Sequence, residues 1–150
     1  MASNHRVLRL WTRGAAGGPM MMSDSIDTVA GRGIVGDHTF GRMRHVTIVF
    51  DDDWRVAAAT LGRDVDPAGR RANVLVTGGE GARFVGATIR IGRVEIEVRG
   101  ITEPCPVMDE AAPGMQAALK PGGLAGVWGR VTVGGTIRPG DELEEVRGRS

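Results

Sequence analysis

The side chain best suited to chemistry in this sequence is that of its single cysteine, Cys105, which carries a thiol. It lies in the segment Thr102-Glu103-Pro104-Cys105-Pro106, where two prolines remove backbone donors and stiffen the chain on both sides of the sulfur. We therefore predict a loop that presents the thiol, although free cysteines in general are more often buried as small hydrophobes. A thiolate can carry a persulfide or ligate a soft or transition metal, but one cysteine cannot build a structural zinc site.

Arg70, Arg71 and Asn73 form a compact polar cluster at the entry to an apolar segment. A planar guanidinium can clamp a carboxylate or a phosphate, and an amide can read the edge of a heterocycle. A solvated basic turn explains the same residues equally well, because exposed arginines are common. The glycine-rich residues 14–18 could offer backbone amides to an anion, but they lack the Lys and Ser/Thr of a phosphate-binding loop.

A second glycine-rich segment, residues 31–41, contains Asp37 and His38, and Arg44 and His45 follow it directly. The sequence has no metal-ligand spacing such as His-Glu-x-x-His. A structural tie between this loop and the next strand is therefore at least as good an interpretation of the histidines as metal ligation.

The elements that must position these residues are expected to be mostly short strands. With 24 glycines and 7 prolines, the chain has turn residues throughout, which suits many strands better than a few long helices. Apolar and charged residues alternate on both sides of Gly92-Arg93, and this pattern predicts a tight hairpin with one face in water. Strands joined by tight turns close most easily into a small barrel, because closure removes exposed edges.

The further elements follow from apolar runs and turn residues. We expect strands near residues 7–11, 45–50, 73–76 and 143–146, and pairing of Val131 and Val133 across Gly134-Gly135 with Ile137. Short helices are predicted over residues 53–61 and 115–119, the first because acidic residues favour the positive end of the helix dipole.

Length and composition indicate one globular domain over residues 1–150, because 41% of residues are apolar and 25% are charged. No apolar run approaches the roughly 20 residues of a membrane-spanning helix, and residues 1–10 do not resemble a signal sequence. A lone cysteine fits the reducing cytoplasm. The net charge of +1 and the absence of tyrosine argue against nucleic acid as a partner.

Six motifs occur in a characteristic order along the chain. They are Gly33-Ile34-Val35-Gly36-Asp37-His38, Arg71-Ala72-Asn73, Thr102-Glu103-Pro104-Cys105, Gly126-Val127-Trp128-Gly129-Arg130-Val131, Gly134-Gly135 and Gly140-Asp141. Together they resemble the MOSC domain, which is found at the C-terminus of molybdenum cofactor sulfurases and alone in many bacteria. The resemblance extends from the first expected strand to the last, with one departure at Ala72, where the family often has proline.

The resemblance implies a mainly β fold, a small closed β-barrel with a few short helices, that binds the molybdenum cofactor (molybdopterin). Cys105 matches the family cysteine that bonds the metal or carries sulfur, and Arg71 and Asn73 match positions that contact the cofactor. On the same basis the loop with Asp37 and His38 and the residue Pro104 are expected at the cofactor, and we predict that these segments converge on one pocket.

Two functions are compatible with this resemblance, and a third possibility is a barrel that has kept the fold and binds something else. In the first, the protein is an oxidoreductase in which Cys105 ligates molybdenum and N-hydroxylated or N-oxygenated compounds are reduced. In the second, it is a sulfur-carrier or sulfurtransferase module for the cofactor, with Cys105 as a persulfide and no turnover of its own. The chain has no pyridoxal-phosphate domain and no iron-sulfur or flavin segment, so a separate protein is expected to donate electrons or sulfur.

Overall fold

The computed structural model describes residues 5–147, and over this range the chain is mainly β with a few short helices. Residues 1–4 and 148–150 lie outside the described residues; they include part of the segment 1–10 in which we predict no signal sequence and both ends of the predicted domain. The strands are β1 (Val7–Thr12), β2 (Met21–Ser23), β3 (Ile26–Val29), β4 (Gly33–Ile34), β5 (Val46–Phe50), β6 (Val74–Val76), β7 (Thr88–Ile91), β8 (Val94–Ile101), β9 (Val127–Val133), β10 (Gly135–Ile137) and β11 (Leu143–Arg147).

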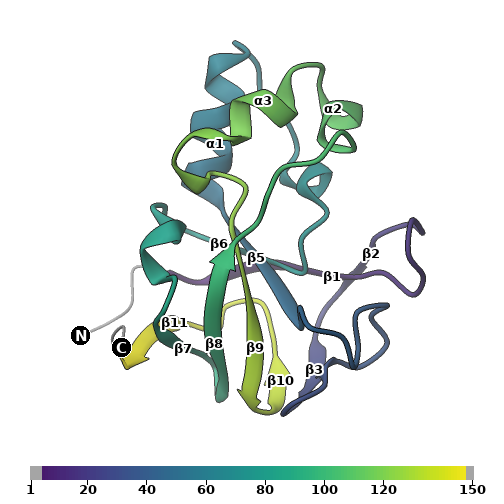
Figure 1. The fold of residues 1–150 in the computed structure, drawn as a ribbon, viewed down its shortest axis with the longest axis vertical. Helices are drawn as coiled ribbons and strands as arrows, with labels where there is room; N and C mark the ends of the chain where they lie inside the picture. Colours follow the sequence, from purple (N-terminus) through teal and green to yellow (C-terminus); the bar gives the residue numbers. More distant parts are fainter. Residues whose placement is uncertain (1–4, 148–150) are drawn as a thin grey trace.

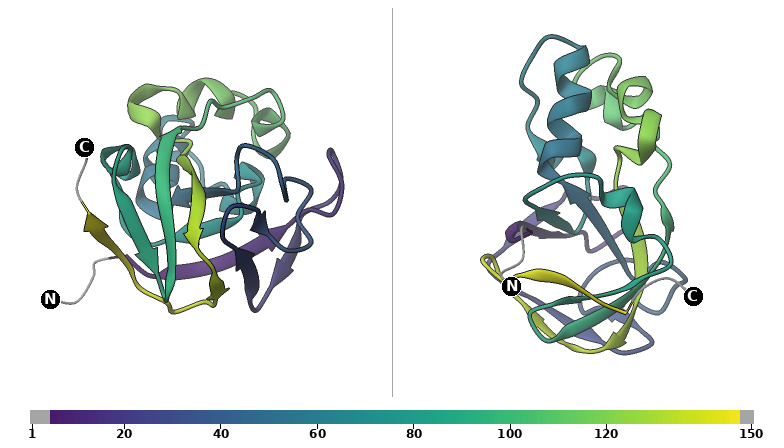
Figure 2. Two further views of the ribbon diagram at one scale, coloured as in Figure 1. Left: turned by 60° about the horizontal axis from the view of Figure 1, so that its bottom comes forward. Right: turned by 90° about the vertical axis from the view of Figure 1, so that its left-hand side faces the viewer.

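Three α-helices and three turns of 3-10 helix complete the secondary structure. They are α1 (Asp51–Thr60), α2 (Met108–Ala111), α3 (Met115–Leu119), η1 (Pro67–Arg70), η2 (Gly81–Phe84) and η3 (Pro121–Gly123) within residues 5–147. The α-helices gather at one end of the molecule, with the strands at the other (Figures 1 and 2). No helix in residues 5–147 has both the length and the apolar character needed to cross a membrane.

Eight strands form one sheet in the order β11-β7-β8-β9-β5-β6-β1-β2, and β10-β3-β4 form a second. Only the pair β5 and β6 is parallel; all other paired strands in the described residues are antiparallel. The large sheet curls so that the beginnings of β1 and β11 meet, through the bridge between Arg6 and Glu142 and backbone bonds such as Val7 N–H to the Asp141 carbonyl (2.9 Å). The junction consists of one isolated bridge and a few backbone hydrogen bonds, and β1 and β11 are not paired along their length in the described residues.

Two apolar clusters hold the fold together. One fills the space enclosed by the curled sheet and includes Ile48, Phe50, Ile89 and Ile96, which are 0–1% exposed. The other lies between the sheet and the helices and includes Trp54 of α1, whose indole Nε1 donates to the Val65 carbonyl (2.6 Å).

Most of the expected elements are present. The hairpin around Gly92-Arg93 is confirmed, with Ile91 opposite Val94, and α3 has the predicted bounds. Helix α1 begins at residue 51, two residues before the expected start, and its first turn is fixed because the Asp53 carboxylate accepts the N–H groups of Glu80 (2.8 Å) and Gly81 (3.0 Å).

The expected pairing of Val131 and Val133 with Ile137 is wrong. Strand β10 pairs with β3 instead. Thr28 of β3 reinforces this pairing, because its hydroxyl donates to the Gly135 carbonyl (2.8 Å) and accepts the Gly135 N–H (3.1 Å).

Gly126, at the start of β9, is the tightest glycine position that bears on the site. Its φ is +102°, and a Cβ there would lie 2.1 Å from the Ile48 carbonyl oxygen. Glycine alone allows the chain to pass β5 this closely.

We expect Gly126→Ala to lower the free energy of unfolding by about 3 kcal/mol or more, because both backbone strain and a backbone clash must be relieved. The matched control is Gly122→Ala, where φ is +65° but no atom lies within 4 Å of the added Cβ. That variant should lose only about 1 kcal/mol. Urea denaturation measures both, and equal losses would show that the close approach to β5 is unimportant.

Candidate functional site

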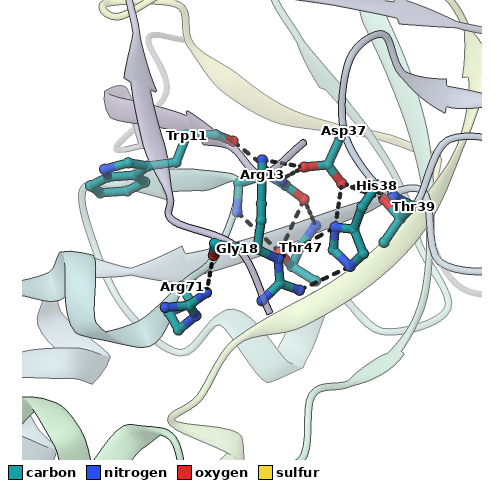
Figure 3. Close-up of polar contacts among 9 residues, drawn as sticks. Trp11, Arg13, Gly18, Asp37, His38, Thr39, Thr47 and Arg71 are labelled. Atoms are coloured by element: carbon teal, nitrogen blue, oxygen red, sulfur yellow. Dashed lines mark hydrogen bonds and ion pairs between the residues drawn. The ribbon is translucent and has the colours of Figure 1, made fainter. Parts of the chain in front are cut away.

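A pocket of about 280 Å³ lies beside the ends of β1, β5 and β6, and it gathers most of the residues singled out in the sequence. Figure 3 shows its polar core, in which the side chains of Arg13, Asp37 and His38 lie close to Thr47 of β5, whereas the indole of Trp11 points away. Its lining residues are Arg13, Met20, Asp37, His38, Thr39, Arg44, Val46, Thr47, Arg70, Arg71, Asn73, Thr102 and Glu103.

Asn73 joins three segments at the floor of the pocket. Its amide oxygen accepts the backbone N–H (3.0 Å) and the hydroxyl (3.1 Å) of Thr47, and its amide nitrogen donates to the Trp11 carbonyl (3.2 Å) and to the Asp37 carboxylate (3.3 Å). All four hydrogen-bonding positions of the amide are thus used within the protein. Asn73 therefore positions the pocket wall, and a direct contact to a ligand stays a prediction.

Asp37 organises the loop above this floor. Its buried carboxylate accepts the N–H of Arg13 (2.9 Å) and both the N–H (3.3 Å) and the hydroxyl (2.6 Å) of Thr39. A terminal nitrogen of Arg13 lies 2.9 Å from Nε2 of His38, whose Nδ1 is 3.6 Å from the Asp37 carboxylate. The loop is thus fixed, and His38 and Arg13 border the pocket together (Figure 3).

Arg71, which lines the pocket, has a left-handed backbone conformation. Its φ and ψ are 61° and 35°, because it ends the 3-10 turn η1, and its guanidinium donates to the Gly18 carbonyl (2.6 Å). The glycine-rich loop 14–18 is irregular, as expected, and it contributes a carbonyl oxygen here.

Arg70 is the most unusual group in the pocket, because its cation is buried without an anion. Only 7% of the residue is exposed, its Nε donates to the Ala125 carbonyl, and no carboxylate in residues 5–147 forms an ion pair with it. Its terminal nitrogens make no hydrogen bond within the described chain. Burial lowers the pKa of Arg70 to about 10; the nearby Cys105 opposes this effect, and the cation of Arg44 adds to it.

Cys105 lies next to this pocket in an exposed loop, as its two prolines predict. Residues 102 and 103 line the pocket, and the hydroxyl of Thr102 donates to the same Ala125 carbonyl (2.8 Å) that Arg70 contacts. The Cys105 side chain itself does not line the pocket, although it interacts electrostatically with Arg70. Pro104 lines a separate hollow of about 300 Å³ with Gln116, whose side chain donates to the Pro104 carbonyl (3.4 Å).

His45 is a structural tie between the loop and the strands. Its ring is fully buried, and Nδ1 accepts the N–H of Val131 (2.9 Å) in β9. Burial is the main cause that lowers the pKa of His45, so the neutral ring is favoured.

A larger hollow of about 910 Å³ along α1 does not match the predicted chemistry. Of its three arginines, Arg9 and Arg55 pair with Asp66 (3.0 Å) and Asp51 (2.9 Å), and Arg63 is exposed to solvent. None of the sequence-predicted site residues lines it. The smaller pocket, which holds the buried cation of Arg70 and most of the sequence-predicted residues, is therefore the candidate site.

Sequence reasoning missed Arg13 and Thr47 as pocket residues. Arg13 lies at the end of the apolar segment that forms β1, directly before the glycine-rich loop, and this position is a signal that could have drawn attention to it. Thr47 carries no such signal, because its role depends on the parallel neighbour β6, which the sequence pattern does not identify.

We expect Arg70→Met to raise the free energy of unfolding by about 1 to 3 kcal/mol in buffer without phosphate or sulfate, because it removes a buried and unpaired charge. The Ala125 carbonyl keeps its bond from Thr102. Arg71→Met is the matched control, and it should lose about 1 kcal/mol with the bond to Gly18. Denaturant unfolding measures both, and a lower stability for Arg70→Met than for Arg71→Met would contradict the assignment of an unpaired cation.

Comparison with known proteins gives the family. The chain is similar in structure to the YUAD protein from Bacillus subtilis, with a TM-score of 0.79 and 21% identity over 93% of both chains. It is also similar to YiiM from Escherichia coli, with a TM-score of 0.71 and 20% identity over 100% of this chain and 72% of that one.

A further similar structure is YiiM from Geobacillus stearothermophilus, with a TM-score of 0.69 and 16% identity over 95% of this chain and 75% of that one. These likenesses concern the fold. Comparison with curated protein sequences gave no match.

The model of the MOSC domain matches residues 35–144, which include the loop with Asp37, the arginine cluster and the Cys105 segment. The chain therefore belongs to the MOSC domain family.

Proposed function

We propose that this protein binds the molybdenum cofactor in the arginine-lined pocket and uses it as an oxidoreductase that reduces N-hydroxylated or N-oxygenated compounds. The MOSC family is associated with binding and handling of this cofactor. The observation that carries the proposal is Arg70, a buried cation that faces the pocket without an anion of its own. A buried charge is costly unless it is paired, so a site of this kind is suited to an anionic ligand.

The residues of the pocket fit the parts of the cofactor. The phosphate group matches the cations of Arg70, Arg71 and Arg44, because guanidinium groups bind phosphate oxygens in pairs. The Asp37 loop, with His38 at the pocket, borders the space for the heterocycle, and Asn73 keeps that wall in place.

Cys105 would hold the metal. When bound, the cofactor supplies the two-electron redox chemistry of molybdenum, and a thiolate is a suitable soft ligand for that metal. Arg70 interacts electrostatically with Cys105, and the stiff loop with Pro104 and Pro106 keeps the sulfur at the edge of the pocket. Electrons are proposed to come from a separate protein in the cytoplasm.

A sulfur-carrier function is the second candidate, and the exposure of Cys105 favours it. A persulfide carrier must present its sulfur to a donor protein and then to the acceptor, and Cys105 is exposed and does not line the pocket.

In both functions the pocket binds the cofactor. We propose that the strands beside this pocket belong to a closed barrel. The bonds that join β1 to β11 support this closure.

Metal and sulfane-sulfur analysis of protein purified from a host that makes the cofactor separates the two functions. We expect one molybdenum per chain, and loss of most of it in Cys105→Ser, because a hydroxyl stays protonated and ligates the metal poorly. Sulfane sulfur on Cys105 without molybdenum would favour the carrier instead. Protein with neither metal nor sulfane sulfur would contradict both.

The fold of Cys105→Ser should be unaffected. Because the thiol is exposed, the free energy of unfolding should change by no more than about 1 kcal/mol. The matched control is Val107→Ser, an exposed position in the same loop, which should keep the molybdenum. A large loss of stability in Cys105→Ser would show that the cysteine is structural.

A further inference from the structure

Trp128 lies in a row of residues that runs across the sheet toward the pocket. On β9 it stands directly opposite Thr47 of β5 on one side and Gly100 of β8 on the other. Side chains directly opposite each other in an antiparallel pair share one face of the sheet. The indole of Trp128 is therefore on the face that carries Thr47, which lines the pocket and binds Asn73.

Gly100 provides room for this indole. A Cβ at position 100 would lie 2.8 Å from Nε1 of Trp128, which is closer than two such atoms can come. The ring thus extends over the glycine, and its place depends on the absence of a side chain there.

The indole of Trp128 contacts the guanidinium of Arg44. The guanidinium carbon of Arg44 lies 5.0 Å from the centre of the Trp128 ring, within the range of a cation–π contact. Arg44 lines the pocket with Arg70, and the two cations repel each other across it. In the absence of an anion, this repulsion favours an Arg44 side chain that turns out into solvent, so a partner is needed to keep it at the pocket.

We propose that Trp128 is a positioning residue that holds Arg44 beside Arg70, so that the two guanidinium groups are arranged in advance for one phosphate monoester. The proposal rests on the proposed function, because it concerns the same pocket, and it adds a residue that does not itself touch the ligand. A preorganised site binds more tightly because less side-chain freedom is lost on binding.

The test is a titration of the cofactor-free protein with methyl phosphate, followed by phosphorus NMR at low ionic strength. Trp128→Leu should weaken binding by about tenfold, because the cation–π contact is lost. Trp128→Phe keeps an aromatic face and should stay within about threefold of the parent. Gly100→Ala displaces the indole but mutates neither arginine, and it should weaken binding as much as Trp128→Leu does.

A double-mutant cycle with Arg44→Gln separates positioning from a general structural effect. If Trp128 acts through Arg44, then Trp128→Leu should cause no further loss of affinity in the Arg44→Gln background. Circular dichroism identifies variants that fail to fold. If Trp128→Leu is one of them, the methyl phosphate affinities of Trp128→Phe and Gly100→Ala test the positioning role instead.

Two results would overturn the proposal in different ways. If the parent binds methyl phosphate and a folded Trp128→Leu binds it equally well, the positioning role is wrong while the anion pocket stands. If the parent binds no methyl phosphate, the anion pocket itself is wrong, and the positioning role is wrong with it.

Discussion

The buried and unpaired charge of Arg70 is the constraint on which the rest of the site depends. Burial lowers the pKa of Arg70 to about 10, so the charged form is disfavoured relative to that of an exposed arginine. The fold tolerates this cost at the end of η1, where one carbonyl oxygen and no carboxylate meets the guanidinium. An anionic ligand would offset this cost.

The parallel pair β5 and β6 builds the wall against which this charge is held. Thr47 and Asn73 exchange backbone and side-chain hydrogen bonds across the pair, and Asn73 extends the network to β1 and to Asp37. Antiparallel neighbours on the other side supply Trp128 under Arg44. The pocket is thus formed by the ends of several strands, while its charged groups come mainly from the loops that follow or precede them.

Local patterns predicted the elements well and the long-range pairings less well. The hairpin around Gly92-Arg93 and helix α3 follow from nearby residues alone. The pairing of β10 with β3 joins residues more than a hundred positions apart, such as Gly135 and Thr28, and no local pattern contains it. For the same reason the sequence indicated the polar cluster with Arg71 and Asn73, but not that Asn73 uses all its hydrogen bonds within the wall.

Anomalous X-ray scattering at the molybdenum absorption edge, from crystals of cofactor-loaded protein, tests the central claim most directly. The account predicts a molybdenum peak beside the Cys105 sulfur, with the phosphate of the cofactor in contact with Arg70. A molybdenum peak in the hollow along α1, or a cofactor phosphate that does not contact Arg70, would contradict it.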